Sequence, residues 1–267
     1  RKDDMQLGKD MNVKDSIPEA KMMEIVDDII AMDVKAVTFS GGGDPFCYPY
    51  FQKTIEKLVT SPVRFASLTN GSRLNGPIAE LFANHGTWLR ISIDGWDDDS
   101  YAKYRNIARG EFTKVLRNME QFKQLGGNCL LGVSIVVDKE NAPHIFEMVT
   151  QFKQIGVDSV KISPCIVSND GAENNRYHQP LFQTVKPQVH KAKEQLEAPS
   201  FLVYDAYHEL DEKFNKHYKW CPYIQILPII GADLNIYSCQ DKAYNLDDGL
   251  IGSIKDVRFK DFCLTNK

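Results

Sequence analysis

Short apolar runs alternate with longer segments of helical period as far as residue 163, and this alternation constrains the fold more than any other feature. The runs predict five strands: AVTF (36–39), VRFASLT (63–69), WLRISI (88–93), LLGVSIVV (130–137) and SVKIS (159–163). Intervening segments, such as IPEAKMMEIVDDIIAM (17–32), place apolar residues at helical spacing. Apolar strands that alternate with helices are typical of a parallel sheet covered by helices.

The composition is that of an ordinary globular protein, with 43% hydrophobic residues, 25% charged residues and a net charge of −4. No basic stripe favours nucleic acid, and no apolar run approaches the ~20 residues of a membrane helix, so neither is an expected partner. The six cysteines are scattered through a chain too large to need disulfides. We therefore expect a reducing, cytoplasmic location.

Glycine-rich or polar motifs directly follow three of the predicted strands: SGGGDP (40–45), TNGS (69–72) and DGWDDDS (94–100). Ligands of parallel α/β proteins bind at the carboxyl ends of the strands, so these motifs are candidates for a ligand site. Three consecutive glycines pack nothing, which favours a place where a ligand presses against the backbone. The alternative for each motif is a plain turn, because turns also need Gly, Asn and Asp.

The pattern changes after about residue 165. A polar loop and a predicted helix (179–197) precede three short runs, FLVYD (201–205), YIQILPII (223–230) and LNIYSC (234–239). Gly231, Ala232 and Asp233 between the last two runs predict a β-hairpin. We therefore expect a core at 1–200 and a small second unit at 201–267.

Several common catalytic motifs are excluded. Phe46 stands where a dinucleotide-binding fingerprint needs its third glycine, and no Gly-Lys-Ser/Thr of a P-loop follows the glycines. HELDE (208–212) has Glu212 where a zinc-protease helix needs its second histidine.

Taken together, the motifs resemble those of radical S-adenosylmethionine (radical SAM) enzymes. TFSGGGDP (38–45) resembles their Gly-Gly-Glu motif, with Asp44 in place of glutamate, and SLTNGS (67–72) and RISIDGWDDDSYAKYR (90–105) resemble the next two strand ends. CPYIQILPIIGADLNIYSC (221–239), followed by LIGSIKD (250–256), resembles the SPASM or twitch appendage of many of these enzymes. The resemblance covers nearly the whole chain, with four motifs in the family's order.

The resemblance implies an α/β fold, a partial (β/α)6 TIM-like barrel with a small C-terminal β-hairpin and helix appendage. It implies an oxidoreductase-type enzyme that cleaves SAM reductively with a 4Fe-4S cluster, giving a 5′-deoxyadenosyl radical that abstracts hydrogen. Peptide modification and oxidation or epimerisation of a small molecule are both open, with a slight preference for a small molecule because no leader-peptide module is recognised. An electron donor such as flavodoxin or ferredoxin is the implied partner. No catalytic residue is assigned.

The resemblance assigns these residues to SAM: Gly42, Gly43, Asp44, Thr69, Asn70, Ser92, Asp94 and Arg105. The two glycines would let backbone carbonyls approach the ammonium group. Asp44 would be its counter-charge, or else a cap before Pro45. Thr69 and Asn70 would shape the floor of the site, or else form a plain turn.

Three further residues would hold other parts of the ligand. Ser92 and Asp94 alternate on one face of a strand and would reach the ribose hydroxyls, or else form a satisfied pair at the strand end. Arg105 would hold the SAM carboxylate through a bidentate fork, or else lie on a helix surface.

The family holds its cluster with Cys-x-x-x-Cys-x-x-Cys, a spacing absent from these 267 residues. We expect those ligands, with the first barrel strand, upstream of Arg1; the alternative is a relative that has lost the cluster. Cys221 and Cys239 flank the predicted hairpin and are candidate ligands of an auxiliary iron–sulfur cluster, with a disulfide as the competing outcome. Cys47, Cys129 and Cys165 are expected to be structural, and Cys263 is a weaker ligand candidate.

Two other functions stay open. A barrel without a cluster could bind SAM or a partner without catalysis. An aldolase-type barrel would need a lysine at a strand end, and Lys161 is the one lysine inside a predicted strand.

Overall fold

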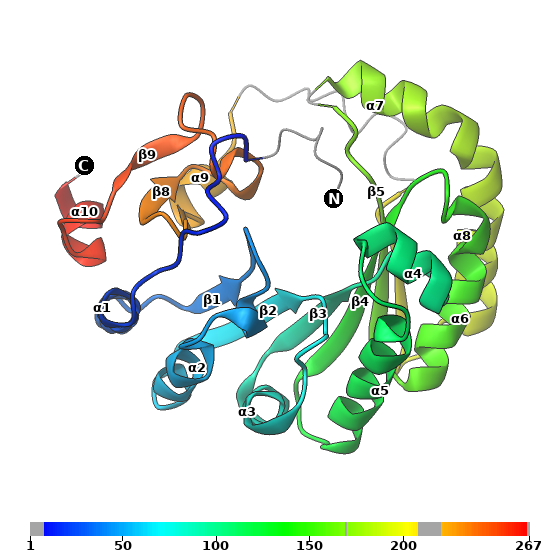
Figure 1. Cartoon of the computed structure of the whole chain (residues 1–267), viewed down its shortest axis with the longest axis horizontal. Helices are drawn as coiled ribbons and strands as arrows, with labels where there is room; N and C mark the ends of the chain where they lie inside the picture. The colour runs from blue at the N-terminus through cyan, green and yellow to red at the C-terminus, as the bar shows by residue number, and fades with distance from the viewer. Residues whose placement is uncertain (1–7, 169, 208–219, 266–267) are drawn as a thin grey trace. The chain divides into compact units, whose positions relative to one another are not determined.

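The computed structural model describes residues 8–168, 170–207 and 220–265 (Figure 1). The chain divides within strand β2 into two compact units. One comprises residues 67–216, and the other combines residues 6–66 with residues 217–267.

Six strands form one sheet in the order of the chain, β1 to β6. They are β1 (Ala36–Phe39), β2 (Arg64–Thr69), β3 (Trp88–Ser92), β4 (Leu130–Val137), β5 (Ser159–Pro164) and β6 (Leu202–Asp205). The pairs from β3 to β6 are parallel, and helices connect consecutive strands. This confirms the predicted α/β fold with a six-strand parallel sheet. Over the described residues the sheet is open, with β1 and β6 as its edges.

The sixth strand corrects one expectation. FLVYD was predicted to belong to a small C-terminal unit, but Leu202–Asp205 pairs with β5 and completes the large sheet. Its inward residue Val203 is 3% exposed, while Leu202 and Tyr204 on the other face are exposed. A four-residue edge strand with one buried residue carries too weak a pattern to be assigned to a particular sheet.

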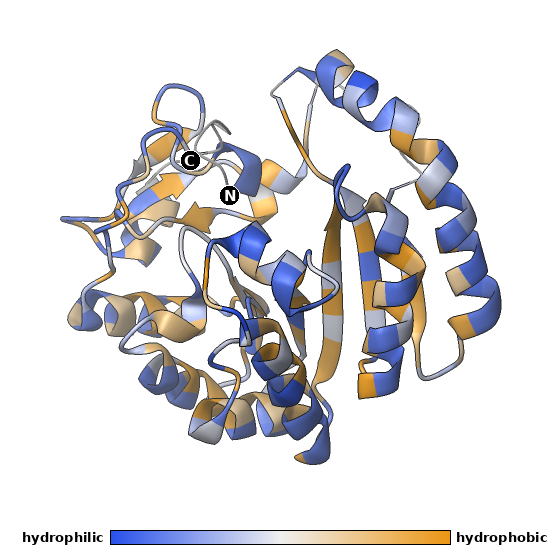
Figure 2. Cartoon of the chain, turned by 45° about the vertical axis from the view of Figure 1, so that its right-hand side comes forward, coloured by the Kyte–Doolittle hydropathy of each residue, from blue (hydrophilic) through white to orange (hydrophobic). Residues whose placement is uncertain are grey.

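The strands of the first unit are apolar on one face and polar on the other. Leu89, Ile91 and Ile93 on β3 and just beyond it are essentially fully buried, whereas Arg90 and Ser92 between them are half-buried. Four of the described helices cover the buried face: α3 (Gly76–His85), α5 (Glu111–Gln124), α6 (Ile145–Ile155) and α8 (Phe182–Leu196). Their polar sides face outward in Figure 2. Two others, α4 (Asp98–Arg105) and α7 (Gly171–His178), follow the carboxyl ends of β3 and β5. The alternation places every second strand side chain on the face opposite the four covering helices, which we call the uncovered face because no helix of the described first unit packs on it.

The strand register aligns side chains of that uncovered face in rows. One row runs Ser92, Ser134, Lys161 and Tyr204 across β3 to β6. The row below it, toward the amino ends of the strands, runs Arg90, Gly132, Ser159 and Leu202.

The second unit contains α1 (Glu19–Ala31), α2 (Phe51–Val59), α9 (Tyr223–Ile226) and α10 (Phe259–Thr265), with a small sheet of β7 (Ile229–Ile230), β8 (Asn235–Tyr237) and β9 (Leu250–Ser253). The antiparallel pairing of β7 with β8 confirms the predicted hairpin. YIQI is helix α9 rather than strand, because a short apolar run does not distinguish the two by periodicity.

An ion pair between a buried aspartate and a partly exposed arginine joins the two ends of this unit. Asp28 on α1 is 0% exposed, and Arg258 donates to its carboxylate from Nη2 at 2.6 Å and from Nε at 3.0 Å. Burial raises the pKa of Asp28, but the hydrogen bonds from Arg258 and from the Lys260 backbone N–H outweigh it and lower the pKa overall.

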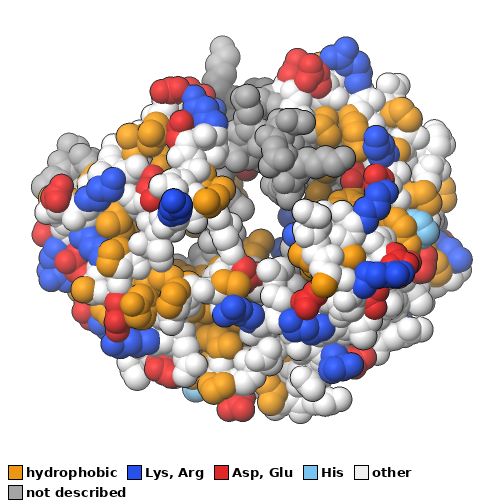
Figure 3. Space-filling view, viewed as in Figure 1, with side chains coloured by type: hydrophobic (Ala, Val, Ile, Leu, Met, Phe, Trp, Pro, Cys, Tyr) orange, Lys and Arg blue, Asp and Glu red, His pale blue; other side chains and the backbone are white. Residues whose placement is uncertain are grey.

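On the face that Figure 3 shows, basic and acidic side chains are interspersed, as on an ordinary solvated surface. Within the described ranges, no helix combines the length and apolar character needed to cross a membrane.

Candidate functional site

Arg105, Ser92 and Asp94 meet at the carboxyl end of β3. Arg105 Nη2 donates to Asp94 Oδ2 at 2.8 Å, to the Ser92 backbone oxygen at 3.1 Å and to Ser92 Oγ at 3.4 Å. The Arg105 and Asp94 side chains are 28% and 14% exposed. The structure thus brings together three residues that the sequence assigned to one ligand, with Ser92 and Asp94 both accepting from Arg105. Their predicted ligand role stays a prediction.

Helix α4 holds Arg105 in place. The helix begins with a capping box in which Ser100 N–H donates to Asp97 Oδ1 at 2.7 Å and Asp97 N–H donates to Ser100 Oγ at 3.0 Å. Hydrogen bonds from the Ser100 backbone and side chain to the Asp97 carboxyl lower its pKa. The helix ends after Arg105, where Asn106 adopts the left-handed conformation with φ of 52°. Because α4 is short and capped at its start, it holds Arg105 at a fixed distance from the carboxyl end of β3.

One nitrogen of the Arg105 guanidinium, Nε, is buried and has no hydrogen-bond partner among the described residues. The Arg105 Cζ lies 5.7 Å from the Tyr101 ring centroid. An unpaired buried N–H is costly, so this nitrogen is suited to an acceptor on a ligand.

Asn141, which sequence reasoning missed, fixes Asp94 from the next strand end. Asp94 Oδ1 accepts from Val136 N–H at 3.2 Å. Asn141 Nδ2 donates to the backbone oxygens of Asp94 and Val136 at 3.1 and 2.9 Å. Tyr104 on α4 donates to Asp138, which also accepts from Asn141 N–H. The sequence feature that could have pointed to Asn141 is VDKEN (137–141), a polar stretch at the end of the fourth predicted strand.

Thr69 and Asn70 form a tight turn at the end of β2. Thr69 Oγ1 accepts from Gly71 N–H at 3.1 Å, and Asn70 Oδ1 accepts from Ser72 N–H at 2.8 Å. Gly71 has a φ of +77°, and buried Asn118 on α5 donates to its carbonyl at 2.8 Å. The turn that was the alternative for these residues is present. Their predicted ligand role stays a prediction.

The glycine run lies in the second unit. A Cβ on Gly42 would come within 2.7 Å of Met11 Sδ, whereas a Cβ on Gly43 would meet nothing within 4 Å. Asp44 Oδ1 accepts from Phe46 N–H at 2.9 Å and caps the short 3-10 helix η1 (Pro45–Cys47). The cap that was the alternative for Asp44 is therefore formed, and bare backbone is open to a ligand at Gly43.

Cys221 and Cys239 are half-buried free thiols in the second unit. Cys221 precedes α9, and Cys239 directly precedes the 3-10 helix η5 (Gln240–Lys242). Among the residues with described positions, no three His, Cys, Asp or Glu side chains gather as a metal site. Both cysteines remain predicted cluster ligands.

A second polar cluster, also missed by sequence reasoning, lies beyond the end of β5. His178 Nε2 lies 2.7 Å from the Cys165 backbone oxygen, and Nδ1 lies 3.0 Å from the Tyr207 hydroxyl. A carbonyl only accepts, so Nε2 carries the proton and Nδ1 accepts from Tyr207. Burial lowers the pKa of His178, which is 1% exposed. The imidazole thus joins α7 to the strand end as a neutral bridge.

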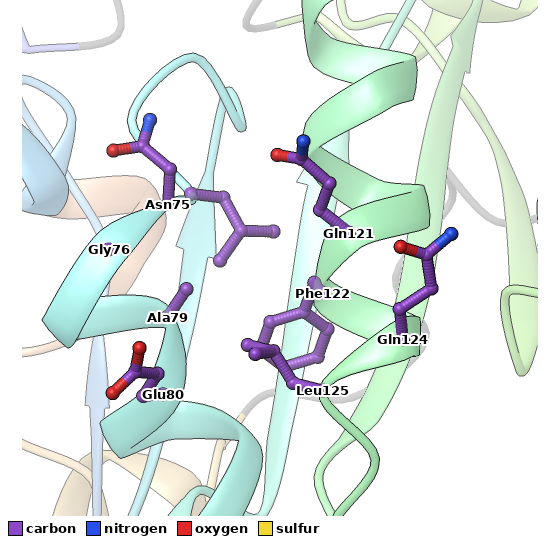
Figure 4. Close-up of a pocket in the computed structure, with 9 residues that line it drawn as sticks. Asn75, Gly76, Ala79, Glu80, Gln121, Phe122, Gln124 and Leu125 are labelled. Carbon is purple, nitrogen blue, oxygen red and sulfur yellow. The ribbon is translucent and has the colours of Figure 1, made fainter.

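A groove between α3 and α5 lies in the helical layer of the first unit (Figure 4). Ala79, Phe122 and Leu125 form its apolar part, and Asn75, Gln121 and Gln124 present amides. None of the predicted site residues lines it.

Comparisons with known proteins identify one family. The model of the radical SAM superfamily matches residues 5–152. An S-adenosylmethionine-dependent nucleotide dehydratase of Lacinutrix mariniflava is 26% identical over 98 residues, which is 37% of this chain and 20% of that protein.

Solved structures share the fold at low sequence identity. SuiB of Streptococcus suis bound to precursor peptide SuiA has a TM-score of 0.64 and 14% identity, over 92% of this chain and 58% of SuiB. SuiB bound to S-adenosylmethionine has a TM-score of 0.62 and 17% identity, over 88% of this chain and 56% of SuiB. Native anSMEcpe with bound AdoMet and Cp18Cys peptide has a TM-score of 0.61 and 17% identity, over 94% of this chain and 73% of anSMEcpe. The chain spans little more than half the length of SuiB and a fifth of the dehydratase.

Proposed function

Because the chain belongs to the radical SAM superfamily, whose model matches more than half of its residues, we propose that it binds SAM and modifies a peptide by hydrogen abstraction. Ser92, Asp94 and Arg105 are the proposed SAM contacts of the first unit. Membership of this family supports the conclusion that the protein is an enzyme. We further propose that it is of the oxidoreductase type.

The arrangement around Arg105 carries this proposal. The Arg105 guanidinium holds a strand-end carboxylate through Nη2, and its buried Nε has no partner within the described part of the chain, so it has donors to offer a ligand carboxylate. Ser92 and Asp94 add hydroxyl and carboxylate acceptors of the kind that bind ribose hydroxyls. This donor set fits the amino-acid and ribose parts of SAM.

When bound and reductively cleaved, SAM supplies the hydrogen-abstracting group of this family. The residues of the chain bind and orient the ligand. Arg105 would hold the carboxylate, and Asp94 would hold a ribose hydroxyl while Asn141 keeps the Asp94 backbone in place. Gly42, Gly43 and Asp44 are proposed contacts from the family pattern, and the open backbone at Gly43 supports their role. Thr69 and Asn70 are proposed to shape the floor of the site.

The residues present do not fit the family's 4Fe-4S cluster. The sequence lacks Cys-x-x-x-Cys-x-x-Cys, and no three-ligand group lies within the described positions. We propose that the ligands are encoded upstream of Arg1, which the gene sequence tests directly. An auxiliary cluster at Cys221 and Cys239 is likewise proposed, and it would need further ligands.

A peptide is the substrate class that the structural comparisons support. SuiB and anSMEcpe were both solved with peptides bound, and each shares the fold over more than 90% of this chain. The proposed peptide substrate replaces the slight preference for a small molecule that came from the sequence. A flavodoxin- or ferredoxin-like electron donor in the cytoplasm belongs to the same proposal.

Titration of the full-length protein with SAM tests the proposed site. We expect Arg105→Gln to weaken SAM binding about tenfold or more, because a charge-assisted contact is lost. Arg109→Gln is the matched control, since Arg109 pairs with Asp99 in an exposed ion pair. Equal SAM affinity of Arg105→Gln and wild type would remove Arg105 from the site. SAM binding by a full-length protein that takes up no cluster on anaerobic reconstitution, and that does not cleave SAM, would favour the non-catalytic alternative.

A further inference from the structure

The uncovered face of β3 to β6 is polar at its centre. Ser92, Ser134 and Lys161 occupy one row of the register, and Arg90 lies on the same face of β3 one row nearer the amino end. All four are half-buried. Two residues of strand advance about 7 Å, so Arg90 lies within the reach of a substrate held beside Ser92.

Arg90 extends across β4 above a glycine. A Cβ built on Gly132 would lie 3.6 Å from Arg90 Nε and 2.9 Å from Ser159 Oγ, so the bare backbone of Gly132 leaves space for both side chains. The Arg90 guanidinium also lies 5.5 Å from the Trp88 ring centroid, on the same face of β3. The strand and the indole therefore fix the position of this cation.

Arg90 has no anionic partner among the described residues. Its Nε is buried without a hydrogen-bond partner, and none of the ion pairs of the described chain includes it. Arg105, Arg109 and Arg258, by contrast, each pair with an aspartate. Burial lowers the pKa of Arg90, and the nearby Tyr204 phenol opposes that shift. A partly desolvated cation without a counter-charge is energetically unfavourable unless a bound ligand supplies an anionic group.

We propose that Arg90 binds an anionic oxygen group of the substrate, a carboxylate or a phosphate, on the uncovered face of the sheet next to Ser92. The inference rests on the proposed function, because it assigns the substrate of that site. A planar guanidinium held against an indole presents its fork in one orientation, which suits carboxylate and phosphate oxygens. Lys161, one row nearer the carboxyl ends and two strands away, adds a second positive charge to the same face.

Calorimetric titration without SAM tests this inference on the full-length protein. The probes are inorganic phosphate, the peptide acetyl-Gly-Glu-Gly-amide and its neutral counterpart acetyl-Gly-Gln-Gly-amide. We expect wild type to bind phosphate or the glutamate peptide in preference to the neutral peptide, and the preferred probe identifies the source of the anion. Arg90→Gln should weaken that binding roughly tenfold to a hundredfold, which is the range for a lost charge-assisted contact.

Arg117→Gln is the matched control, because Arg117 is exposed on α5. It should leave anion binding within about twofold of wild type and remove the same formal charge. Arg90→Lys keeps the charge without the fork and should give an intermediate affinity, which also covers the case in which Arg90→Gln does not fold.

The inference is overturned if wild type binds neither anionic probe, or if Arg117→Gln weakens binding as much as Arg90→Gln. SAM titration of Arg90→Gln separates the two proposals. Loss of anion binding with wild-type SAM affinity supports a substrate site at Arg90, whereas loss of SAM binding in a folded variant returns Arg90 to the SAM site. Anion binding by a wild type that does not bind SAM would leave the Arg90 site in place and refute the proposed function.

Discussion

Asn141 donates a hydrogen bond from Nδ2 to the backbone oxygen of Asp94 at 3.1 Å, across 47 positions of the chain. The same nitrogen donates to the Val136 oxygen, and Oδ1 accepts from Asp138 N–H at 2.9 Å. Asn141 is 0% exposed. One buried amide therefore holds the carboxyl ends of β3 and β4 together at the point where Asp94 meets Arg105.

Replacing this amide should destabilise the protein and its site together. Asn141→Ala leaves two carbonyls and one N–H without their partner, so we expect the free energy of unfolding to fall by about 3 kcal/mol. Urea denaturation measures the change. Asn75→Ala is the control, because Asn75 is exposed and makes no side-chain cap hydrogen bond. An Asn141→Ala protein as stable as the control variant would show that water replaces the amide.

Gly43 offers a cleaner test of the glycine run than Gly42. A side chain at Gly42 displaces Met11, whereas a side chain at Gly43 enters open space. We expect Gly43→Val to keep the wild-type melting temperature within a few degrees and to lose SAM binding, because the new side chain would fill the approach to the ligand. Circular dichroism and SAM titration measure the two properties. Unchanged SAM affinity in a folded Gly43→Val protein would contradict the assignment.

The neutral bridge at His178 should make stability depend on pH. The folded-state pKa of His178 lies below the unfolded value of about 6.5, so the unfolded chain binds the extra proton first. Its stabilising contribution is complete above about pH 6.5 and is lost as the pH falls through the folded-state pKa. Urea midpoints between pH 7.5 and 5.5 should therefore decrease for wild type and less so for His178→Gln.

His190→Gln is the matched control, since the His190 side chain is 72% exposed. It should keep the wild-type decrease. Nitrogen-15 NMR should further show the proton on Nε2 of His178. A protonated Nδ1 in the neutral state would contradict the hydrogen-bond assignment to Tyr207 and Cys165.

Removing Arg258 from the Asp28–Arg258 pair should destabilise the protein more than removing Asp28. Arg258→Leu leaves a fully buried carboxylate without its counter-charge, and we expect it to lower the free energy of unfolding by about 3–5 kcal/mol. Asp28→Leu, which leaves a partly exposed arginine free to reach water, should cost less. Because the pKa of Asp28 is lowered in the folded state, its contribution is present above the unfolded value near 4 and disappears as the pH falls further.

Lys9→Gln serves as the control for this pair, because Lys9 and Asp247 form an exposed ion pair. Exposed pairs of this kind contribute little to stability. If Asp28→Leu proved as damaging as Arg258→Leu, the packing of the side chains rather than the unpaired charge would explain both.

The sequence pattern predicted most of the first unit because each strand and helix there is long enough to show its period. The eight-residue β4 and the helices before and after it follow directly from apolar spacing. Short elements were assigned less well. Four-residue β6 was placed in the wrong part of the fold, because so short a strand does not show which sheet it joins. YIQI was taken for a strand, because its length does not distinguish helix from strand.

The candidate site was predictable only where residues follow a strand directly. Ser92 ends β3 and Asp94 lies two positions further on, so their common face could be read from the sequence. The ion pair between Arg105 and Asp94 depends on where α4 ends, and the role of Asn141 depends on the pairing of β3 with β4. Such contacts arise from tertiary packing and have no local sequence signal.

The second unit is built from two stretches of chain that are made at different times. Asp28 leaves the ribosome 230 residues before Arg258. At typical synthesis rates of about 5–20 residues per second, this interval is on the order of 10–50 s. During that time α1 has no arginine for its carboxylate and no α10 to pack against. We therefore expect the order of folding in the cell to be inverted relative to the order of the sequence, with residues 67–216 completing their contacts before the segment that precedes them.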